Sequence, residues 1–178
     1  MIYSPREDSY LLEKEVKRYA KDKKVLDLGA GSGIQAESAL KEGVKSVLCA
    51  DIDFKVVEFL RKKGLNVIQS DLFSNIKGKF ELIIFNPPYL PADESDNKES
   101  RVQTTGGRRG DEIIVRFLED VKNYLSEEGI ILIVISSLTP RDRILRVLKE
   151  KGLKKEVISK EDFFMESLEV WKIVNEEH

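Results

Sequence analysis

Short apolar runs alternate with amphipathic segments along almost the whole chain, which is the pattern of strands that alternate with helices. The runs that predict strands lie at residues 24–28, 46–50, 65–69, 80–85, 129–136, 153–159 and 168–174. The segments that predict helices lie at residues 5–20, 34–42, 54–63, 111–126 and 140–151. Most of the strands are apolar throughout, which indicates a parallel sheet that is buried on both faces.

The last two strands depart from this pattern because only residues 160–167 separate them. This link is too short for a helical crossover, so the two strands are expected to pair antiparallel. The expected fold class is therefore α/β, with a doubly wound, mostly parallel seven-stranded sheet, one antiparallel edge strand and helices on both faces.

The 178 residues are expected to form a single domain, residues 1–178, because no repeat or linker marks a boundary. Its first helix lies within residues 1–23, with Ser4 as the expected N-cap and Glu7 as the partner in a capping box. Residues 90–110 are polar and long for a connection in a compact domain, so they are expected to form a lid or substrate-binding loop.

The charged residues nearly balance, with 30 Lys and Arg against 32 Asp and Glu. A net charge of -2 argues against a protein that binds nucleic acid through bulk electrostatics. A charged fraction of 35% beside 41% hydrophobic residues indicates a globular protein, and the abundance of Lys and Glu is typical of thermophiles. No apolar run approaches the ~20 residues of a membrane span, so a cytoplasmic protein without a membrane contact is expected.

Two residue types are too rare for several common chemistries. The single cysteine, Cys49, allows neither an intramolecular disulfide nor a multi-cysteine metal site, and it is expected in the core. The single histidine, His178, is the last residue, which is a poor place to hold catalytic geometry. The sequence therefore predicts a reaction without imidazole and without a metal.

Candidate binding and catalytic residues lie at or just after the ends of four predicted strands. A glycine turn, residues 27–33, ends the first strand, Asp51 ends the second, Asp71 follows the third and residues 86–89 (Asn-Pro-Pro-Tyr) follow the fourth. In an open parallel sheet, ligands bind beyond the carboxyl ends of the strands. These segments are therefore expected to meet at one site.

The glycine turn favours a cationic ligand over a dinucleotide. Its spacing is G-x-G-x-G, and Ile34 stands where the last glycine of a dinucleotide motif would fall. Asp27 beside the turn would repel a pyrophosphate and attract a positive charge. Asp51 can accept both hydroxyl groups of a ribose. A nucleoside with a positively charged tail satisfies these conditions, and S-adenosylmethionine is such a molecule.

These motifs, in this order, resemble those of the class I S-adenosylmethionine-dependent methyltransferases. The chain more closely resembles the HemK family of glutamine methyltransferases, in its short archaeal and eukaryotic branch. The two segments that carry the narrower resemblance are Tyr3-x-Pro5-x-Glu7-Asp8-Ser9-x-Leu11-Leu12 and Gly106-Gly107-Arg108-Arg109-Gly110. The resemblance covers nearly the whole chain and implies the Rossmann-like methyltransferase fold.

The resemblance also implies roles for individual residues. Those implied to contact S-adenosylmethionine are Ser9, Asp27, Gly29 and Gly31 at its methionine end, Asp51 at the ribose, Asp71 and Leu72 at the adenine, and Asn86. Those implied to hold the target nitrogen are Asn86, the carbonyl group of Pro87 and, packed beside them, Tyr89.

The implied reaction moves a methyl group from S-adenosylmethionine to the amide nitrogen of a glutamine, and S-adenosylhomocysteine is the product. The implied substrate is the Gly-Gly-Gln loop of a class I translation release factor, and an implied partner is a small zinc-binding activator protein. An amide nitrogen is a poor nucleophile, so alignment by two acceptors would supply most of the catalysis, in agreement with the absence of a histidine base.

Other functions stay open on the residues alone. Asn-Pro-Pro-Tyr also suits a methyltransferase that acts on the adenine amino group of RNA or DNA, although the balanced charge disfavours direct nucleic-acid binding. A protein-lysine methyltransferase and a cofactor-binding scaffold subunit without activity are the remaining alternatives.

Simpler interpretations also exist for single residues. Asp53 is preferred as a helix N-cap, Asp71 alone could be an ordinary loop acid, and Ser9 alone could be a solvated or packing helix residue. The pair Phe163-Phe164 is expected to pack inside, and would belong to a partner surface if it were exposed.

Overall fold

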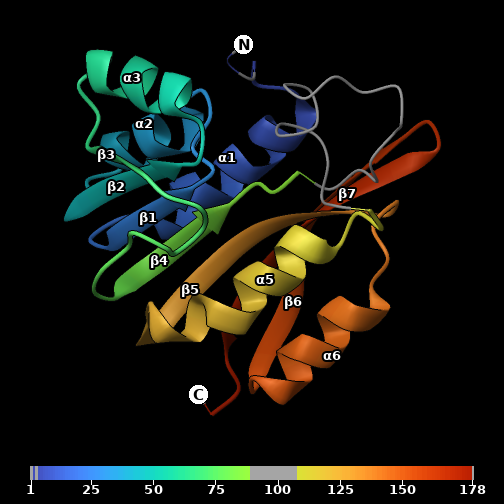
Figure 1. The fold of residues 1–178 in the computed structure, drawn as a ribbon. Coiled ribbons are helices and arrows are strands. Elements are labelled where there is room, and N and C mark those ends of the chain that lie inside the picture. Colours follow the sequence, from blue (N-terminus) through green and yellow to red (C-terminus); the bar gives the residue numbers. More distant parts are fainter. Residues whose placement is uncertain (1, 3, 89–107, 178) are drawn as a thin grey trace.

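One sheet organises the computed structural model, which describes residues 2, 4–88 and 108–177 (Figure 1). Its strands are β1 (Lys24–Leu28), β2 (Ser46–Asp51), β3 (Val67–Gln69), β4 (Phe80–Phe85), β5 (Leu125–Ser136), β6 (Leu153–Phe163) and β7 (Glu166–Asn175). Across the sheet the order is β3-β2-β1-β4-β5-β7-β6, and β7 runs antiparallel to both neighbours. The predicted fold class is confirmed, and the reversed strand β7 lies just inside the edge strand β6.

Helices cover both faces of this sheet (Figure 1). They are α1 (Glu7–Tyr19), α2 (Ile34–Lys41), α3 (Phe54–Lys62), α5 (Glu112–Asp120) and α6 (Asp142–Glu150), with a short 3₁₀ helix, η1 (Val121–Asn123), after α5. Residues of α1, α2 and α3 belong to one apolar cluster, and residues of α5 and α6 belong to the other. Among the residues that the structure describes, no helix is both long enough and apolar enough to cross a membrane.

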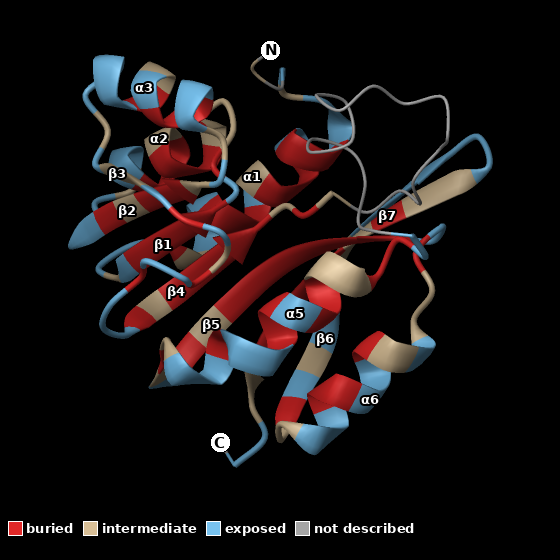
Figure 2. Cartoon of the chain, in the orientation of Figure 1, coloured by how far each residue is buried: buried red, intermediate tan, exposed pale blue. Residues whose placement is uncertain are grey.

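The central strands are apolar on both sides because each side faces one of these clusters (Figure 2). In β4, Leu82 and Ile84 pack under α1, α2 and α3. Their neighbours Ile83 and Phe85 pack under α5. The buried Cys49 on β2 belongs to the first cluster, as predicted for a core residue. The continuous apolar runs of the sequence thus have a direct physical cause.

Several helix boundaries differ from the prediction. Helix α1 begins at Glu7, and its first turn is closed from inside by the Ser9 hydroxyl, which accepts the Arg6 amide hydrogen at 3.4 Å. The predicted capping box from Ser4 to Glu7 is therefore wrong. Helix α6 begins at Asp142, two residues after the predicted start, and before it the Thr139 amide donates to the Ser136 carbonyl group in a turn.

The predicted helix over 111–126 and the predicted start of the next strand are also wrong. Helix α5 ends at Asp120, and β5 already begins at Leu125. The buried Leu125 pairs with Phe80 at the start of β4, and a register shift follows it. Residues 126–128 after Leu125 are polar, so the apolar pattern does not predict this part of the strand.

The antiparallel pair β6–β7 is longer than predicted. Pairing continues through Lys160–Glu169 and Asp162–Ser167 to Phe163–Glu166, so only Phe164 and Met165 form the turn. The added part is polar and exposed on β6, and apolar runs therefore could not reveal it. The expectation that Phe163-Phe164 packs inside is wrong, because Phe164 is 93% exposed.

The glycine turn after β1 depends on backbone conformations that other residues rarely adopt. Gly29, Gly31 and Gly33 all have positive φ, at 63°, 52° and 84°. A Cβ atom on Gly33 would also lie 2.8 Å from Cδ2 of Leu60, which is buried in the core. Gly33 thus serves both the turn and the close approach of the chain before α2 to Leu60 on α3.

Replacing Gly33 with Ala is expected to lower the free energy of unfolding by about 2–4 kcal/mol, since a left-handed backbone strain adds to the steric clash. Gly43→Ala is the matched control: φ at Gly43 is 78°, but nothing lies within 4 Å of an added Cβ atom. Chemical denaturation should show a loss of only about 1–2 kcal/mol for this control. Equal losses in both variants would contradict the packing role of Gly33.

Candidate active site

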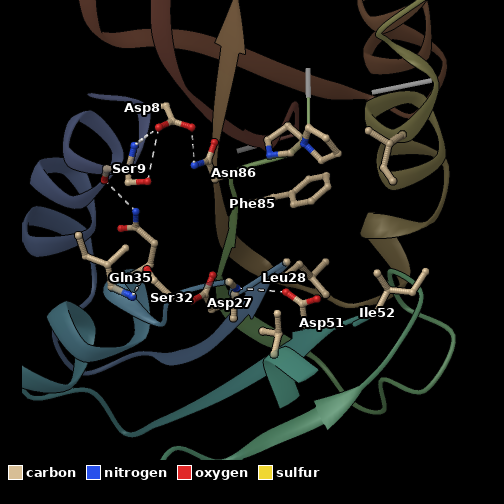
Figure 3. Close-up of a pocket in the computed structure, with 18 of the residues that line it drawn as sticks. Asp8, Ser9, Asp27, Leu28, Ser32, Gln35, Asp51, Ile52, Phe85 and Asn86 are labelled. Atoms are coloured by element: carbon tan, nitrogen blue, oxygen red, sulfur yellow. Dashed lines mark hydrogen bonds between the residues drawn. The ribbon is translucent and has the colours of Figure 1, made fainter. Parts of the chain in front are cut away.

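A cavity of about 470 Å³ lies at the carboxyl ends of β1, β2 and β4 (Figure 3). This volume lies within the range of small-molecule sites. The predicted residues that line it are Ser9, Asp27, Gly29, Gly31, Asp51, Asp71, Leu72, Asn86 and Pro87. Tyr89 and most of the expected loop 90–110 lie outside the described residues. The structure thus brings together every described residue of the predicted site.

Asn86 follows the last residue of β4, and its side-chain amide is held in one orientation. Its Nδ2 atom donates to Oδ2 of Asp8 at 3.0 Å, as Figure 3 shows. A carboxylate accepts but does not donate, so the NH₂ group must face Asp8. Oδ1 of Asn86 is buried and has no hydrogen-bond partner among the described residues. The site therefore holds an oriented acceptor that is ready for a donor.

Asp8 is a site residue that the sequence reasoning missed. It is 5% exposed, and its Oδ1 atom accepts the amide hydrogen of Ser9 at 2.8 Å while Oδ2 accepts from Asn86. Both carboxylate oxygens are thus used as acceptors. Its place between Glu7 and Ser9 in the N-terminal motif was the available signal.

Gln35 on α2 also lines the cavity without having been predicted. Its Nε2 atom donates to the Ser9 carbonyl group at 2.9 Å, and its Oε1 atom is buried without a partner in the described part of the chain. Gln35 therefore ties α1 to α2 and keeps Ser9 at the cavity. Ser9 is 3% exposed, so the interpretation of Ser9 as a solvated residue is wrong.

Asp27 at the end of β1 is buried and presents an unsatisfied oxygen. Its Oδ2 atom has no hydrogen-bond partner among the described residues. Burial, together with the neighbouring Asp51 carboxylate, raises the pKa of Asp27 to about 8. A positive charge in the cavity would stabilise the ionised form of this group.

Asp51 is fixed by the backbone on either side of it. Its Oδ2 atom accepts from the Gly31 amide at 3.1 Å, and its Oδ1 atom accepts from the Asp53 amide at 3.0 Å. Burial raises the pKa of Asp51, while these amide hydrogen bonds act in the opposite direction. Asp53 caps α3 by accepting the Lys55 amide at 2.8 Å, which confirms its predicted role.

The adenine side of the predicted site is more exposed. Asp71 forms an ion pair with Arg116 at 3.1 Å, and about half of each side chain is exposed. Leu72 has a φ of 48°, a strained value for a residue with a side chain. The Ser70 hydroxyl holds this turn by donating to the Leu72 carbonyl group at 2.7 Å.

Acidic groups dominate the described lining of the cavity. The carboxylates are Glu7, Asp8, Asp27, Asp51, Asp53, Asp71 and Glu166, and Arg6 supplies the one basic side chain in that lining. Such a surface attracts a cation and repels a phosphate. The lining therefore agrees with a sulfonium-bearing nucleoside and disagrees with a dinucleotide.

The sheet order and the position of the cavity define the class of Rossmann-like methyltransferases. The chain belongs to the family of methyltransferase small domains, whose model matches residues 7–165.

Individual relatives point within this family to glutamine methylation. The chain is 37% identical over 164 residues to a candidate protein N5-glutamine methyltransferase of Methanocaldococcus jannaschii, covering 88% of this chain and 83% of the relative. It is 29% identical over 170 residues to mouse methyltransferase HEMK2, covering 85% of this chain and 79% of HEMK2. Among solved structures, Mtq2 of E. cuniculi superimposes with a TM-score of 0.79 at 26% identity, covering 98% of both chains. That structure is the Mtq2–Trm112 complex responsible for methylation of the eRF1 translation termination factor.

Proposed function

We propose that this protein transfers a methyl group from S-adenosylmethionine to the side-chain amide nitrogen of a glutamine in a class I translation release factor. The observation that carries the proposal is the buried Oδ1 atom of Asn86, oriented by Asp8 beside an acidic cavity. The named activities of the relatives support the same reaction.

The residues of the cavity suit S-adenosylmethionine. The buried, unsatisfied oxygen of Asp27 would attract its positive charge, the fixed carboxylate of Asp51 would accept its ribose hydroxyls, and the Leu72 turn would border its adenine. Gly29 and Gly31 line the cavity, and their positive φ values allow the tight turn that borders it. When bound, this molecule supplies the electrophilic methyl group on its sulfonium.

The chain's own contribution is to align the glutamine amide. Its two N–H donors match two acceptors, Oδ1 of Asn86 and the carbonyl group of the buried Pro87. These acceptors would direct the nitrogen lone pair into the cavity and stabilise the positive charge that develops on that nitrogen. Positioning of this kind supplies on the order of 7 kcal/mol or more in well-oriented reactions, so no strong base has to act before the transfer.

A label-transfer assay tests this proposal. The protein is incubated with methyl-labelled S-adenosylmethionine and either wild-type release factor or the release factor with its loop glutamine changed to Ala. Transfer RNA and DNA serve as parallel substrates, because an adenine amino group offers the same two donors. Label on the wild-type release factor alone is the expected result, and label on either nucleic acid would overturn the assignment.

The pKa of Asp27 makes cofactor affinity depend on pH. In the free protein Asp27, with a pKa raised to about 8 by burial and the neighbouring Asp51, is mostly protonated near pH 7, whereas a cationic ligand favours its carboxylate. Affinity for S-adenosylmethionine is therefore expected to rise as the pH increases toward about 8, and binding near pH 7 should release a proton. Calorimetry in two buffers of different ionisation enthalpy measures that proton, and Asp27→Asn should abolish its release. Unchanged release in the variant would contradict this role for Asp27.

A small zinc-binding activator protein is the partner that we propose. Mtq2 is bound to Trm112 in the solved complex, and this chain covers nearly all of Mtq2. Gel filtration of the chain with the activator from the same organism should give co-elution at micromolar concentration, whereas separate elution would contradict the partnership. With a release factor as substrate, we expect the protein to act in the cytoplasm.

A further inference from the structure

The β6–β7 hairpin extends past the end of β5 at the edge of the sheet that carries the cavity (Figure 1). Pairing of β7 with β5 ends at Leu168 and Ser136, and residues 162–167 continue beyond that point. Side-chain contacts fix the base of this extension, because the Ser136 hydroxyl donates to Oε1 of Glu166 at 2.7 Å. The Ser137 hydroxyl also accepts the amide hydrogen of Ser167 at 2.9 Å. The hairpin is therefore anchored where it leaves the sheet.

The end of this hairpin is apolar and exposed. We call Phe163, Phe164 and Met165 the hairpin tip; they are 36%, 93% and 80% exposed. A two-residue turn between paired strands normally contains Asn or Gly, because it requires positive φ. Here Met165 adopts a φ of 62°, and the side chains of Phe164 and Met165 gain little burial in return. A strained turn with exposed apolar side chains does not stabilise the fold, so it indicates a functional surface.

The hairpin tip is continuous with the candidate active site. Phe163, Glu166 and Leu168 line the same cavity as Asn86. A polypeptide loop that brings a glutamine to Asn86 enters the cavity that Phe163 also lines, and Phe164 and Met165 follow Phe163 at the exposed end of the hairpin.

Acidic groups flank the tip. Glu161 is exposed, and Asp162 is exposed although Lys160 lies 3.3 Å from it. Glu166, on the other strand, also lines the cavity. The surface that complements this arrangement is an apolar patch with Lys or Arg at its border.

We propose that the hairpin tip docks on the folded body of the protein substrate, outside the loop that is methylated. This inference rests on the proposed function and adds a second contact that selects the whole release factor over its isolated loop. Phe164 and Met165 supply the buried anchors of that contact, as exposed aromatic and methionine side chains do in other interfaces.

Two substrates separate docking from catalysis: the full-length release factor and a short peptide that carries its Gly-Gly-Gln loop. Phe164→Ala is expected to raise KM for the release factor about ten-fold, with kcat retained. The KM and kcat for the peptide should stay unchanged, because Phe164 does not line the cavity. Leu145→Ala is the matched control: Leu145 is 44% exposed on α6, away from the cavity, and its variant should behave as wild type on both substrates.

Met165→Asn distinguishes a docking role of the hairpin tip from a purely structural role, because the two roles predict opposite effects on KM. Asn tolerates positive φ better than Met, so the melting temperature should stay equal or rise. KM for the release factor should nevertheless increase, as for Phe164→Ala. A structural role predicts the reverse, namely a stabilised hairpin with unchanged or improved KM.

Three outcomes would overturn the docking proposal. They are an unchanged KM for the release factor in both variants, an equal rise of KM for peptide and release factor, and a wild-type dimer in gel filtration that Phe164→Ala converts to a monomer. Wild-type protein that methylates neither substrate, even with the activator protein present, would instead refute the proposed function, and the docking proposal would fall with it.

Discussion

The kcat of an Asn86→Ala variant is expected to fall about 100-fold or more, while its affinity for S-adenosylmethionine stays close to that of wild type. The substitution removes the buried Oδ1 atom, which is one of the two proposed acceptors for the substrate amide. Removing one oriented hydrogen-bonding group from a site that stabilises developing charge typically lowers kcat by about 10²–10³. Calorimetric titration with S-adenosylmethionine and single-turnover kinetics measure the two quantities separately.

Parallel losses of turnover and cofactor affinity would contradict this role. They would mean that Asn86 acts mainly by holding the cofactor, a contact that the family resemblance also implies. The glycine turn follows β1 and Asp51 ends β2, and the Gly31 amide donates to Asp51, so their contribution to affinity does not depend on the Asn86 side chain and should survive.

Replacing Asp8 with Asn is expected to lower kcat by about 10- to 100-fold, again with little change in cofactor affinity. Asp8 uses one oxygen for the Ser9 amide and the other for Nδ2 of Asn86. An asparagine has one oxygen; if it keeps the local bond to Ser9, its NH₂ group faces Asn86. The amide of Asn86 must then rotate so that its oxygen accepts from this NH₂ group. Its own NH₂ group then faces the substrate amide, and a buried polar group left without a partner costs about 1–3 kcal/mol.

A second substitution, Asn86→Asp in the Asp8→Asn background, tests this explanation. In the double variant the NH₂ group at position 8 can donate to the carboxylate at position 86, so a donor again faces an acceptor. The double variant should recover part of the lost kcat. Asn86→Asp alone places two carboxylates in contact where Nδ2 and Oδ2 now lie 3.0 Å apart, and it should be poorly active. Glu15→Gln, which neutralises another buried carboxylate of α1, is the matched control and should retain activity. A double variant no better than the worse single variant would show that Asp8 only maintains the fold.

Much of the fold follows from apolar periodicity. Strand β4, which faces apolar clusters on both sides, appears as a mostly apolar run and has the predicted bounds. The extension of β6 to Phe163 was missed because residues 160–162 are charged and exposed. Its conformation depends on cross-strand pairing with β7, which a local pattern cannot reveal.

The part of the site formed by residues at the carboxyl ends of the parallel strands could be predicted from the sequence. Asp27 and Asp51 lie at the carboxyl ends of β1 and β2, Asn86 follows β4, and the topology of the sheet brings them together. Asp8 was missed because its partner is 78 positions away and only the packing of α1 against the sheet joins them. The exposure of Phe164 was missed for a related reason: whether a pair of aromatic residues is buried depends on the tertiary structure.

The central claim is that an oriented acceptor pair aligns a glutamine amide for methyl transfer. Fragmentation mass spectrometry of a release factor, after incubation with this protein and S-adenosylmethionine, tests it most directly. We expect one added methyl group on the side-chain nitrogen of the loop glutamine, and a product from the Asn86→Ala variant that is reduced about 100-fold or more under the same conditions. A methyl group on a lysine or at another site, or an Asn86→Ala variant as active as wild type, would contradict the account.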